Sequence, residues 1–176
     1  LNTYRSSEVC YQNLVSGGTN FLKDPINIPG NWTNNSSFAA IHTQSPRSSG
    51  STDCGVTGGL DDRFDHILVS QNVMNGANLL QYNTNSYKAI GNDGNHYNQS
   101  ILAGTNSQYP DSVVRALYYS SDHLPVKLDV TVTIPANNGL NLTLTYAGSG
   151  CQTGGTSVTV HPNLGQGPYS YQWSAN

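Results

Sequence analysis

Two short stretches of the sequence carry side chains that could do acid–base or metal chemistry. In the first, Asp122 and His123 place a carboxylate next to an imidazole, and Pro125 follows two residues later. The residues beyond Pro125 alternate between aliphatic and polar side chains as far as Thr133, which predicts a strand with one buried face. Asp122 and His123 would then lie at the rim of a sheet, where general acid–base catalysis or metal binding can occur. The alternative is an Asp-His turn that hydrogen-bonds its own backbone.

The second stretch is residues 63–70, with the sequence Arg-Phe-Asp-His-Ile-Leu-Val-Ser. Its apolar second half is typical of a buried strand. Successive residues of a strand face opposite sides, so His66 should point away from the site if Asp65 points toward it. Arg63 could pair with Asp61, with Asp62 or with a substrate phosphate, and a surface ion pair is the default expectation.

The composition restricts the classes of function. The chain has 176 residues, of which 10% are charged, and its net charge is −3. It lacks the basic surface needed for tight nucleic-acid binding, so a nuclease would need a divalent cation to supply positive charge at the phosphate. A chain rich in Asn, Ser, Thr and Gly but poor in charge is typical of secreted or cell-surface bacterial proteins. No apolar run is long enough to span a membrane, and the first residue, Leu1, suggests a fragment.

Sequence patterns predict the elements around these two stretches. Ser6 or Ser7 should cap a helix that ends at Gly17-Gly18, and Asp111 should cap a second helix. Short strands are expected at 38–43, 79–82 and 87–90. A long polar loop covers 44–62, and a turn-rich loop covers 91–96. The two helices should bury apolar stripes, formed by Cys10, Tyr11, Leu14 and Val15 in the first and by Val113, Val114, Leu117 and Tyr118 in the second.

The composition changes after Thr133. Residues 135–139 are rich in Pro, Asn and Gly and indicate a linker. Alternating segments at 140–146 and 156–160 then indicate an all-β module, which stops without a terminal strand. We therefore divide the chain into a domain at 1–134, a linker at 135–139 and a truncated β module at 140–176.

The remaining cysteines and histidines give weaker signals. Cys10, Cys54 and Cys151 show no zinc-ligand spacing, and a Cys10–Cys54 disulfide and buried free thiols both remain open. A structural, hydrogen-bonded role is favoured for His42 over a role in the site. For His96, ligand contact and simple solvent exposure are both open, and His161 is expected to be inert.

Taken together, the stretches at 65–70 and 121–126 resemble the C-terminal half of the endonuclease/exonuclease/phosphatase superfamily, which has the pancreatic-deoxyribonuclease-like fold. Leu1-Asn2 is similar to the last two residues of that family's G-D-x-N motif. The tract from Asp24 to Pro46 resembles secreted bacterial members in particular. The resemblance covers residues 1 to about 134. The tail at 168–174 resembles the start of repeats in surface adhesins of gliding bacteria.

The resemblance implies an α/β fold: the C-terminal half of a four-layer α/β/β/α sandwich, followed by a truncated β-sandwich-like adhesin repeat. It also implies a role for each matching residue. His123 would be the catalytic histidine at the scissile phosphate, and Asp65 would hydrogen-bond the other nitrogen of its ring. Asp122 would bind the divalent metal, Mg²⁺ or else Mn²⁺ or Ca²⁺, directly or through water. Asn2 would orient the attacking water or the phosphate.

The implied function is metal-dependent phosphodiester hydrolysis by a secreted or cell-surface nuclease, with nucleic acid or another phosphodiester as substrate. The alternatives are a catalytically silent surface binding or adhesion module, and a phosphatase or sphingomyelinase-like phosphodiesterase with the same site. The N-terminal half of the domain, which supplies further metal ligands in this family, is missing from the chain. We therefore expect the chain alone to be inactive and poorly stable. We also expect the loop at 92–96 to flank the cleft and shape substrate choice.

Overall fold

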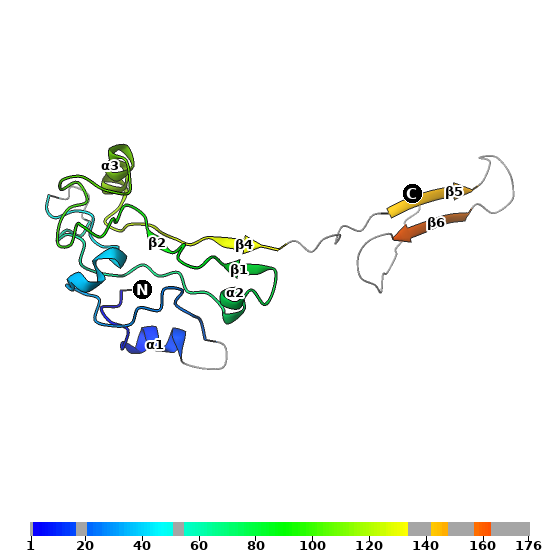
Figure 1. Ribbon diagram of the computed structural model, residues 1–176, viewed down its shortest axis with the longest axis horizontal. Helices are drawn as coiled ribbons and strands as arrows, with labels where there is room; N and C mark the ends of the chain where they lie inside the picture. Colours follow the sequence, from blue (N-terminus) through cyan, green and yellow to red (C-terminus); the bar gives the residue numbers. More distant parts are fainter. Residues whose placement is uncertain (1, 17–20, 51–54, 134–141, 148–156, 163–176) are drawn as a thin grey trace. The chain divides into compact units, whose positions relative to one another are not determined.

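The computed structural model describes residues 2–16, 21–50 and 55–133, together with the backbone of two strands at 142–147 and 157–162 (Figure 1). The chain divides into two compact units, Leu1–Val132 and Thr133–Asn176. The described elements are helices and small antiparallel sheets, a mixed α/β composition. Among the helices described, none is long and apolar enough to cross a membrane. The four-layer sandwich stays a prediction.

The strands of the first unit form two short antiparallel ladders. β1 (Leu80–Tyr82) pairs with β4 (Val130–Val132), and β2 (Lys88–Ala89) pairs with β3 (Val126–Lys127). Figure 1 shows β1 and β4 side by side. The strand expected after Pro125 is therefore present but interrupted at residues 128–129. Its partners are the two strands that were predicted at 79–82 and 87–90.

The predicted buried face of this strand is only partly correct. The side chains of Val126 and Leu128 are half-buried, whereas Val130 and Val132 are 40% and 57% exposed. The exposed valines belong to the two-stranded β1–β4 ladder, and nothing in the described part of the chain covers them fully. The alternating pattern therefore gives the strand correctly but not the burial of its far end.

Helix α3 (Asp111–Ser120) confirms the second predicted helix. Asp111 is its first residue rather than its cap, which is Pro110, and the Asp111 carboxylate pairs with Arg115 one turn later at 2.7 Å. Val114 is buried in a small apolar core, and Leu117 packs against this core. The other core members are Leu60, Ile101 and Leu124.

Helix α1 (Val9–Val15) differs from the prediction in its start and in its buried face. It begins after Glu8 rather than after Ser6 or Ser7. Tyr11 is its one buried side chain, whereas Cys10 and Leu14 are exposed. A helix of two turns can direct a single ring toward the core, so the predicted four-residue stripe is wrong. Cys10 is an exposed free cysteine, and Cys54 and Cys151 lie outside the described residues.

The strand predicted at 38–43 is wrong in most of its length. Residues Ser36–Ile41 form the 3₁₀ helix η1, and the side chain of Asn35 accepts a hydrogen bond from the Ser37 N–H at 3.1 Å. Capping by an Asn side chain favours a helical turn at this point, and here it outweighs the apolar run that follows. The chain becomes extended only from His42 onward. Helix α2 (Gln71–Asn75) was not predicted. Its N-cap is Ser70, whose hydroxyl accepts a hydrogen bond from the Val73 N–H.

The long loop at 44–62 closes on itself at its base. Gln44 forms a β-bridge with Asp62, and Ser45 N–H donates to the Gly59 carbonyl at 2.7 Å. Gly58 and Gly59 both donate to the Arg47 carbonyl. The buried Arg47 side chain donates in turn to the carbonyl of Tyr118 in α3 at 2.8 Å. The described parts of this loop are therefore tied to the core.

A buried ion pair connects Asp24 to the segment at 63–70. Both terminal nitrogens of Arg63 donate to the Asp24 carboxylate, at 2.7 and 3.0 Å, and the Tyr11 hydroxyl donates to the same carboxylate at 2.9 Å. The guanidinium also lies 4.9 Å from the centre of the Trp32 ring. The expectation of a surface pair for Arg63 is therefore wrong, because its true partner lies 39 residues away in sequence.

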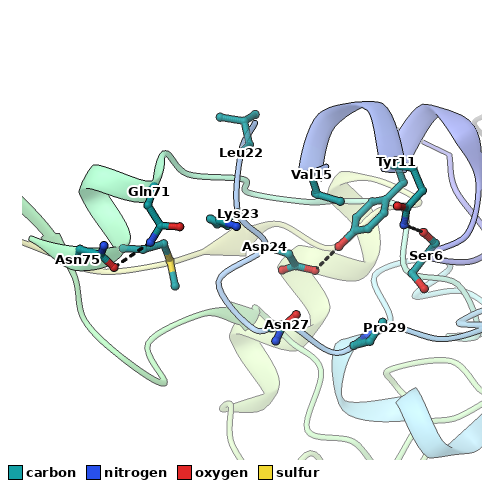
Figure 2. Close-up of a pocket in the computed structure, with 12 residues that line it drawn as sticks. Ser6, Tyr11, Val15, Leu22, Lys23, Asp24, Asn27, Pro29, Gln71 and Asn75 are labelled. Atoms are coloured by element: carbon teal, nitrogen blue, oxygen red, sulfur yellow. Dashed lines mark hydrogen bonds between the residues drawn. The ribbon is translucent and has the colours of Figure 1, made fainter. Parts of the chain in front are cut away.

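The hydrogen bonds of this ion pair keep the buried Asp24 carboxylate ionised. Burial alone would raise the pKa of Asp24, but the hydrogen bonds and charge of Arg63, with the Tyr11 hydroxyl, bring it below its ordinary value. Figure 2 shows the Tyr11 hydroxyl directed at Asp24.

In the second unit, β5 (Leu142–Ala147) pairs antiparallel with β6 (Ser157–Pro162), with Leu142 opposite Pro162 and Ala147 opposite Ser157. These strands lie close to the two segments that the sequence predicts at 140–146 and 156–160. The proposed linker at 135–139 and the motif at 168–174 lie outside the described residues. The assignment of this unit to an adhesin repeat stays a prediction.

The buried ion pair should make a large contribution to stability. Replacing Asp24 by Asn leaves the Arg63 charge buried without a counter-charge, which should lower the free energy of unfolding by about 3–5 kcal/mol. Urea denaturation followed by circular dichroism measures this change. The matched control is Asp111→Asn, which removes the exposed partner of Arg115 and should cost less than about 1 kcal/mol. Equal losses in the two variants would contradict the role assigned to Asp24.

Candidate active site

The structure brings His123 and Asp65 into direct contact, as the sequence predicts. His123 Nδ1 donates to Asp65 Oδ2 at 2.8 Å, and about a third of each side chain is exposed. This hydrogen bond places the proton of the neutral ring on Nδ1 and leaves Nε2 as the acceptor. A solvent-accessible imidazole held in one tautomer by a carboxylate can transfer a proton to or from a bound substrate.

A third segment, Thr43-Gln44, connects the two segments that carry His123 and Asp65, and we call it the middle segment. The sequence analysis did not include it in the site. The Leu124 N–H donates to the Thr43 carbonyl at 2.8 Å. On the other side, the Thr43 hydroxyl oxygen accepts the N–H groups of Phe64 and Asp65, at 3.1 and 3.2 Å. Thr43 is buried. The His123–Asp65 pair is therefore aligned by a shared middle segment, rather than by two strands that neighbour each other directly.

Gln44, the next residue of this middle segment, contacts Nε2 of His123. Its amide nitrogen lies 2.7 Å from His123 Nε2, and because Nδ1 carries the ring proton, the amide donates this hydrogen bond. Gln44 is buried and forms β-bridges with both Asp62 and His123. The sequence offered one signal for it: polar residues follow immediately on the predicted strand at 38–43. The strand itself was misassigned, so this signal was not used.

Asp122 lies at the same turn as His123 and is half-buried. Its Oδ2 accepts the Val56 N–H at 2.8 Å. This hydrogen bond, together with the positive charge of neighbouring groups including Arg47, lowers the pKa of Asp122 below its ordinary value although partial burial opposes the shift. The His123 N–H donates to the Ser121 hydroxyl at 3.0 Å and so fixes the turn before β3. Asp122 therefore offers an ionised carboxylate at the residue directly before His123.

Asn2 is exposed, and the residue after it is tied to the segment that carries Asp65. Thr3 is fully buried, and its hydroxyl lies 3.2 Å from His66 Nε2. The backbone therefore holds Asn2 close to this segment. Its role toward a water or a phosphate stays a prediction.

The buried strand predicted at 63–70 is wrong, because this segment forms only an isolated bridge, between Val69 and Lys23. The His66 side chain nevertheless lies among core residues and not at His123. Its ring packs against Tyr11 and Trp32, with ring centres 5.7 and 5.4 Å apart. Burial, reinforced by the nearby charge of Arg63, lowers the pKa of His66 to about 4. His66 is therefore a neutral core residue at physiological pH.

The structural role expected for His42 is confirmed, because its buried ring donates from Nε2 to the Trp32 carbonyl at 2.8 Å. Neither expectation for His96 holds. His96 is buried, and its two ring nitrogens lie 2.8 Å from Asp93 Oδ1 and from the Ala103 carbonyl. The side chain of His161 lies outside the described residues.

The loop at 92–96 is hydrogen-bonded to the residues that precede the middle segment. The Asn92 amide donates to the carbonyls of Ala39 and His42, at 2.7 and 2.8 Å. His42 directly precedes the middle segment, so this loop braces the residues that align His123 and Asp65. Its influence on substrate choice stays a prediction.

Within the described residues, no group of three or more His, Cys, Asp and Glu side chains could hold a metal ion. Asp122 fits as one hard oxygen ligand for a cation such as Mg²⁺. The described residues do not form a complete metal site, and the remaining ligands of the predicted metal would have to come from elsewhere.

A cavity of about 400 Å³ lies next to α1 (Figure 2). None of the predicted site residues lines it. Its walls combine amide, aliphatic and charged side chains: Ser6, Tyr11, Gln12, Val15, Leu22, Lys23, Asp24, Asn27, Pro29, Gln71, Met74 and Asn75.

Comparison of the chain with protein-family models, curated proteins and solved structures finds no match.

Asp61, which lies next to the middle segment, should make stability dependent on pH. The N–H groups of Asp61 and Asp62 both donate to the Gln44 carbonyl. Burial, and then the charge of Asp62, raises the pKa of Asp61 to about 6. The folded protein thus binds this proton more tightly than the unfolded chain does.

Because folding raises the pKa of Asp61, the contribution of this residue to stability should be most favourable at low pH and should be lost as the pH rises from about 4 to about 6. Asp61→Asn should remove this loss. Since Asp61 is only half-buried, we expect a stabilisation of about 1 kcal/mol at pH 7 and none near pH 3.5. Urea denaturation of both proteins at several pH values tests this. A constant difference across the range would contradict the assignment.

The Thr43 hydroxyl should be needed for alignment as well as stability. Thr43→Val keeps the shape but leaves two backbone N–H groups without their acceptor, which should cost about 1–3 kcal/mol. The hydrogen bond between His123 and Asp65 should also loosen, and the His123 Nδ1–H proton in an NMR spectrum would then exchange faster with water. The control is Thr131→Val, an exposed threonine whose hydroxyl donates to the Asn83 side chain. An unchanged Nδ1–H signal in Thr43→Val would show that Thr43 does not align the pair.

Proposed function

We propose that this chain is the C-terminal part of a secreted, metal-dependent phosphodiesterase of the endonuclease/exonuclease/phosphatase superfamily, acting as a nuclease. The observation that carries the proposal is the hydrogen bond between His123 Nδ1 and the Asp65 carboxylate. Asp122, the residue directly before His123, adds a second carboxylate. Residues 1–134 would hold half of the active site. The N-terminal half of the same domain would supply the other half.

In this proposal His123 acts at the scissile phosphate through Nε2, since Nδ1 is engaged by Asp65. Asp65 holds the ring in one orientation, so a protonated Nε2 can donate to a phosphoryl oxygen or hand on its proton. Gln44 occupies Nε2 in the structure. A primary amide both donates and accepts, so Gln44 can serve the ring in either protonation state by turning its amide. Asn2 would orient the attacking water or the phosphate.

The acidic character of the chain fits a metal-assisted reaction. The net charge is −3, so bound cations rather than a basic surface must offset the charge of the substrate. Asp122 would hold a divalent cation, Mg²⁺ or else Mn²⁺ or Ca²⁺, together with ligands from the N-terminal half. The cation would supply the positive charge that the transition state needs at the phosphate.

Two alternatives use the same observations differently. A phosphatase or sphingomyelinase-like phosphodiesterase would share the His123–Asp65 pair and differ in its substrate pocket. A catalytically silent surface module would keep the fold and bind through the second unit. A panel of DNA, RNA, sphingomyelin and phosphomonoesters, with and without EDTA, distinguishes these possibilities.

The proposal predicts a specific loss of activity in the protein that carries this chain and the residues preceding it. His123→Ala should lower the rate of phosphodiester cleavage by about 10²–10⁴-fold, the range for removal of one acid–base group. Asp65→Asn should cause a loss of similar size, because an amide can no longer hold the ring as a charged acceptor does. Initial rates on a fluorogenic oligonucleotide, with saturating Mg²⁺, measure both.

His161→Ala, in the second unit, is the matched control and should leave the rate unchanged. Residues 1–176 alone should be inactive. Mg²⁺-dependent cleavage that survives His123→Ala would overturn the proposal, as would robust activity from residues 1–176 by themselves.

A further inference from the structure

Tyr4 is a large exposed side chain on a fixed backbone. It is 49% exposed. Its N–H donates to the Glu8 carboxylate at 2.9 Å, and its carbonyl accepts the N–H groups of Trp32 and Thr33, at 2.8 and 3.1 Å. An aromatic side chain whose backbone is already ordered loses little conformational freedom on binding.

A line of rings connects Tyr4 to the catalytic histidine. Tyr4 packs edge-to-face on Phe64, with ring centres 5.2 Å apart and planes at 78°. Phe64 is buried, and its ring centre lies 6.3 Å from that of His123. Phe64 thus occupies the space between the catalytic ring and the exposed one. Tyr4 is therefore separated by a single ring, that of Phe64, from the ring that would face the phosphate.

Arg5, the neighbour of Tyr4, differs from the other arginines. Arg63 is paired with Asp24, Arg47 donates to the Tyr118 carbonyl, and Arg115 is paired with Asp111. The Arg5 side chain is exposed, and among the described residues it has no hydrogen-bond, ion-pair or ring partner. Its guanidinium is therefore available to an anionic ligand.

We propose that Tyr4 and Arg5 determine specificity at the edge of the site by holding a single-stranded nucleic acid. The Tyr4 ring stacks on an unpaired base next to the scissile phosphate, and the Arg5 guanidinium binds a flanking phosphate. This inference rests on the proposed phosphodiesterase function and adds to it the form of the substrate. Stacking on an aromatic ring combined with an arginine contact to the backbone is the usual means of binding single strands.

The same two side chains argue against a duplex as the preferred substrate. In a duplex, the bases are stacked on each other and present no free face to Tyr4. The chain is acidic overall, so contacts to the phosphates of a duplex are few and give little affinity. A stacked base then provides binding energy that charge alone does not.

Binding in EDTA tests the inference separately from catalysis. The full 176-residue chain is titrated at low salt into fluorescein-labelled dT12, rU12, a 12-bp duplex and a 12-mer of abasic sites, with fluorescence anisotropy as the readout. We expect dT12 and rU12 to bind at least tenfold more tightly than the duplex or the abasic strand. A preference between dT12 and rU12 identifies the sugar.

Tyr4→Leu should weaken binding of both single strands about tenfold, within the range for one stacked base, and leave abasic binding unchanged. Tyr4→Phe should keep the affinity.

Arg5→Gln should weaken dT12 and the abasic strand alike and reduce the slope of log affinity against log salt by about 0.7. Matched controls come from α3: Tyr119 is 71% exposed and packs edge-to-face on Tyr118, 5.0 Å away at 81°, and Arg115 lies four residues earlier. Tyr119→Leu and Arg115→Gln should bind as the parent chain does.

Each outcome decides one of the two proposals. If Tyr4→Leu binds dT12 as tightly as the parent chain, or if neither single strand binds better than the duplex, the role of Tyr4 is wrong even if cleavage depends on His123. If Tyr4→Leu loses binding but cleavage does not depend on His123, the single-strand surface stands and the phosphodiesterase proposal fails.

Discussion

The bidentate ion pair between Arg63 and Asp24 is the interaction on which the candidate site depends most. Arg63 is two residues from Asp65, so fixing its guanidinium fixes the start of the segment that presents the Asp65 carboxylate to His123. Asp24 also accepts the Tyr11 hydroxyl, which ties α1 to the same point. A buried charge pair holds its geometry only while both partners are present, because each alone would carry a large desolvation penalty. The site is therefore supported by electrostatics as well as by packing.

The middle segment explains how a site can form from such short strands. Thr43 uses its carbonyl for Leu124 and its hydroxyl for Phe64 and Asp65, so a single buried residue sets the spacing of the segments that carry His123 and Asp65. Gln44 then reaches the free nitrogen of the imidazole. The Asn92 amide donates to the carbonyl of His42, the residue before Thr43. This arrangement needs no extended ladder, because side-chain hydrogen bonds replace the missing strand pairing.

The sequence predicted the contacts that depend on local patterns and missed those that depend on distant partners. The contact between His123 and Asp65 follows from the family resemblance, and helix α3 follows from the spacing of its apolar residues. The strand predicted at 63–70 is absent, although the His66 ring does lie in the core. The burial of Arg63 could not be predicted, because its partner is far away in sequence and lies in a loop rich in Pro and Asn. η1 was misassigned because a short apolar run outweighed the capping signal of Asn35. The missed 3₁₀ turn also concealed Gln44.

The β1–β4 ladder has a consequence for how this chain can be handled. It has only two strands in the described residues, so the outer edge of each carries backbone N–H and C=O groups that no third strand pairs, next to the exposed side chains of Val130 and Val132. Open edges beside apolar side chains are templates for strand addition by another molecule. Concentrated solutions of the chain will tend toward edge-to-edge self-association, and charged substitutions on this ladder are the rational route to a soluble preparation.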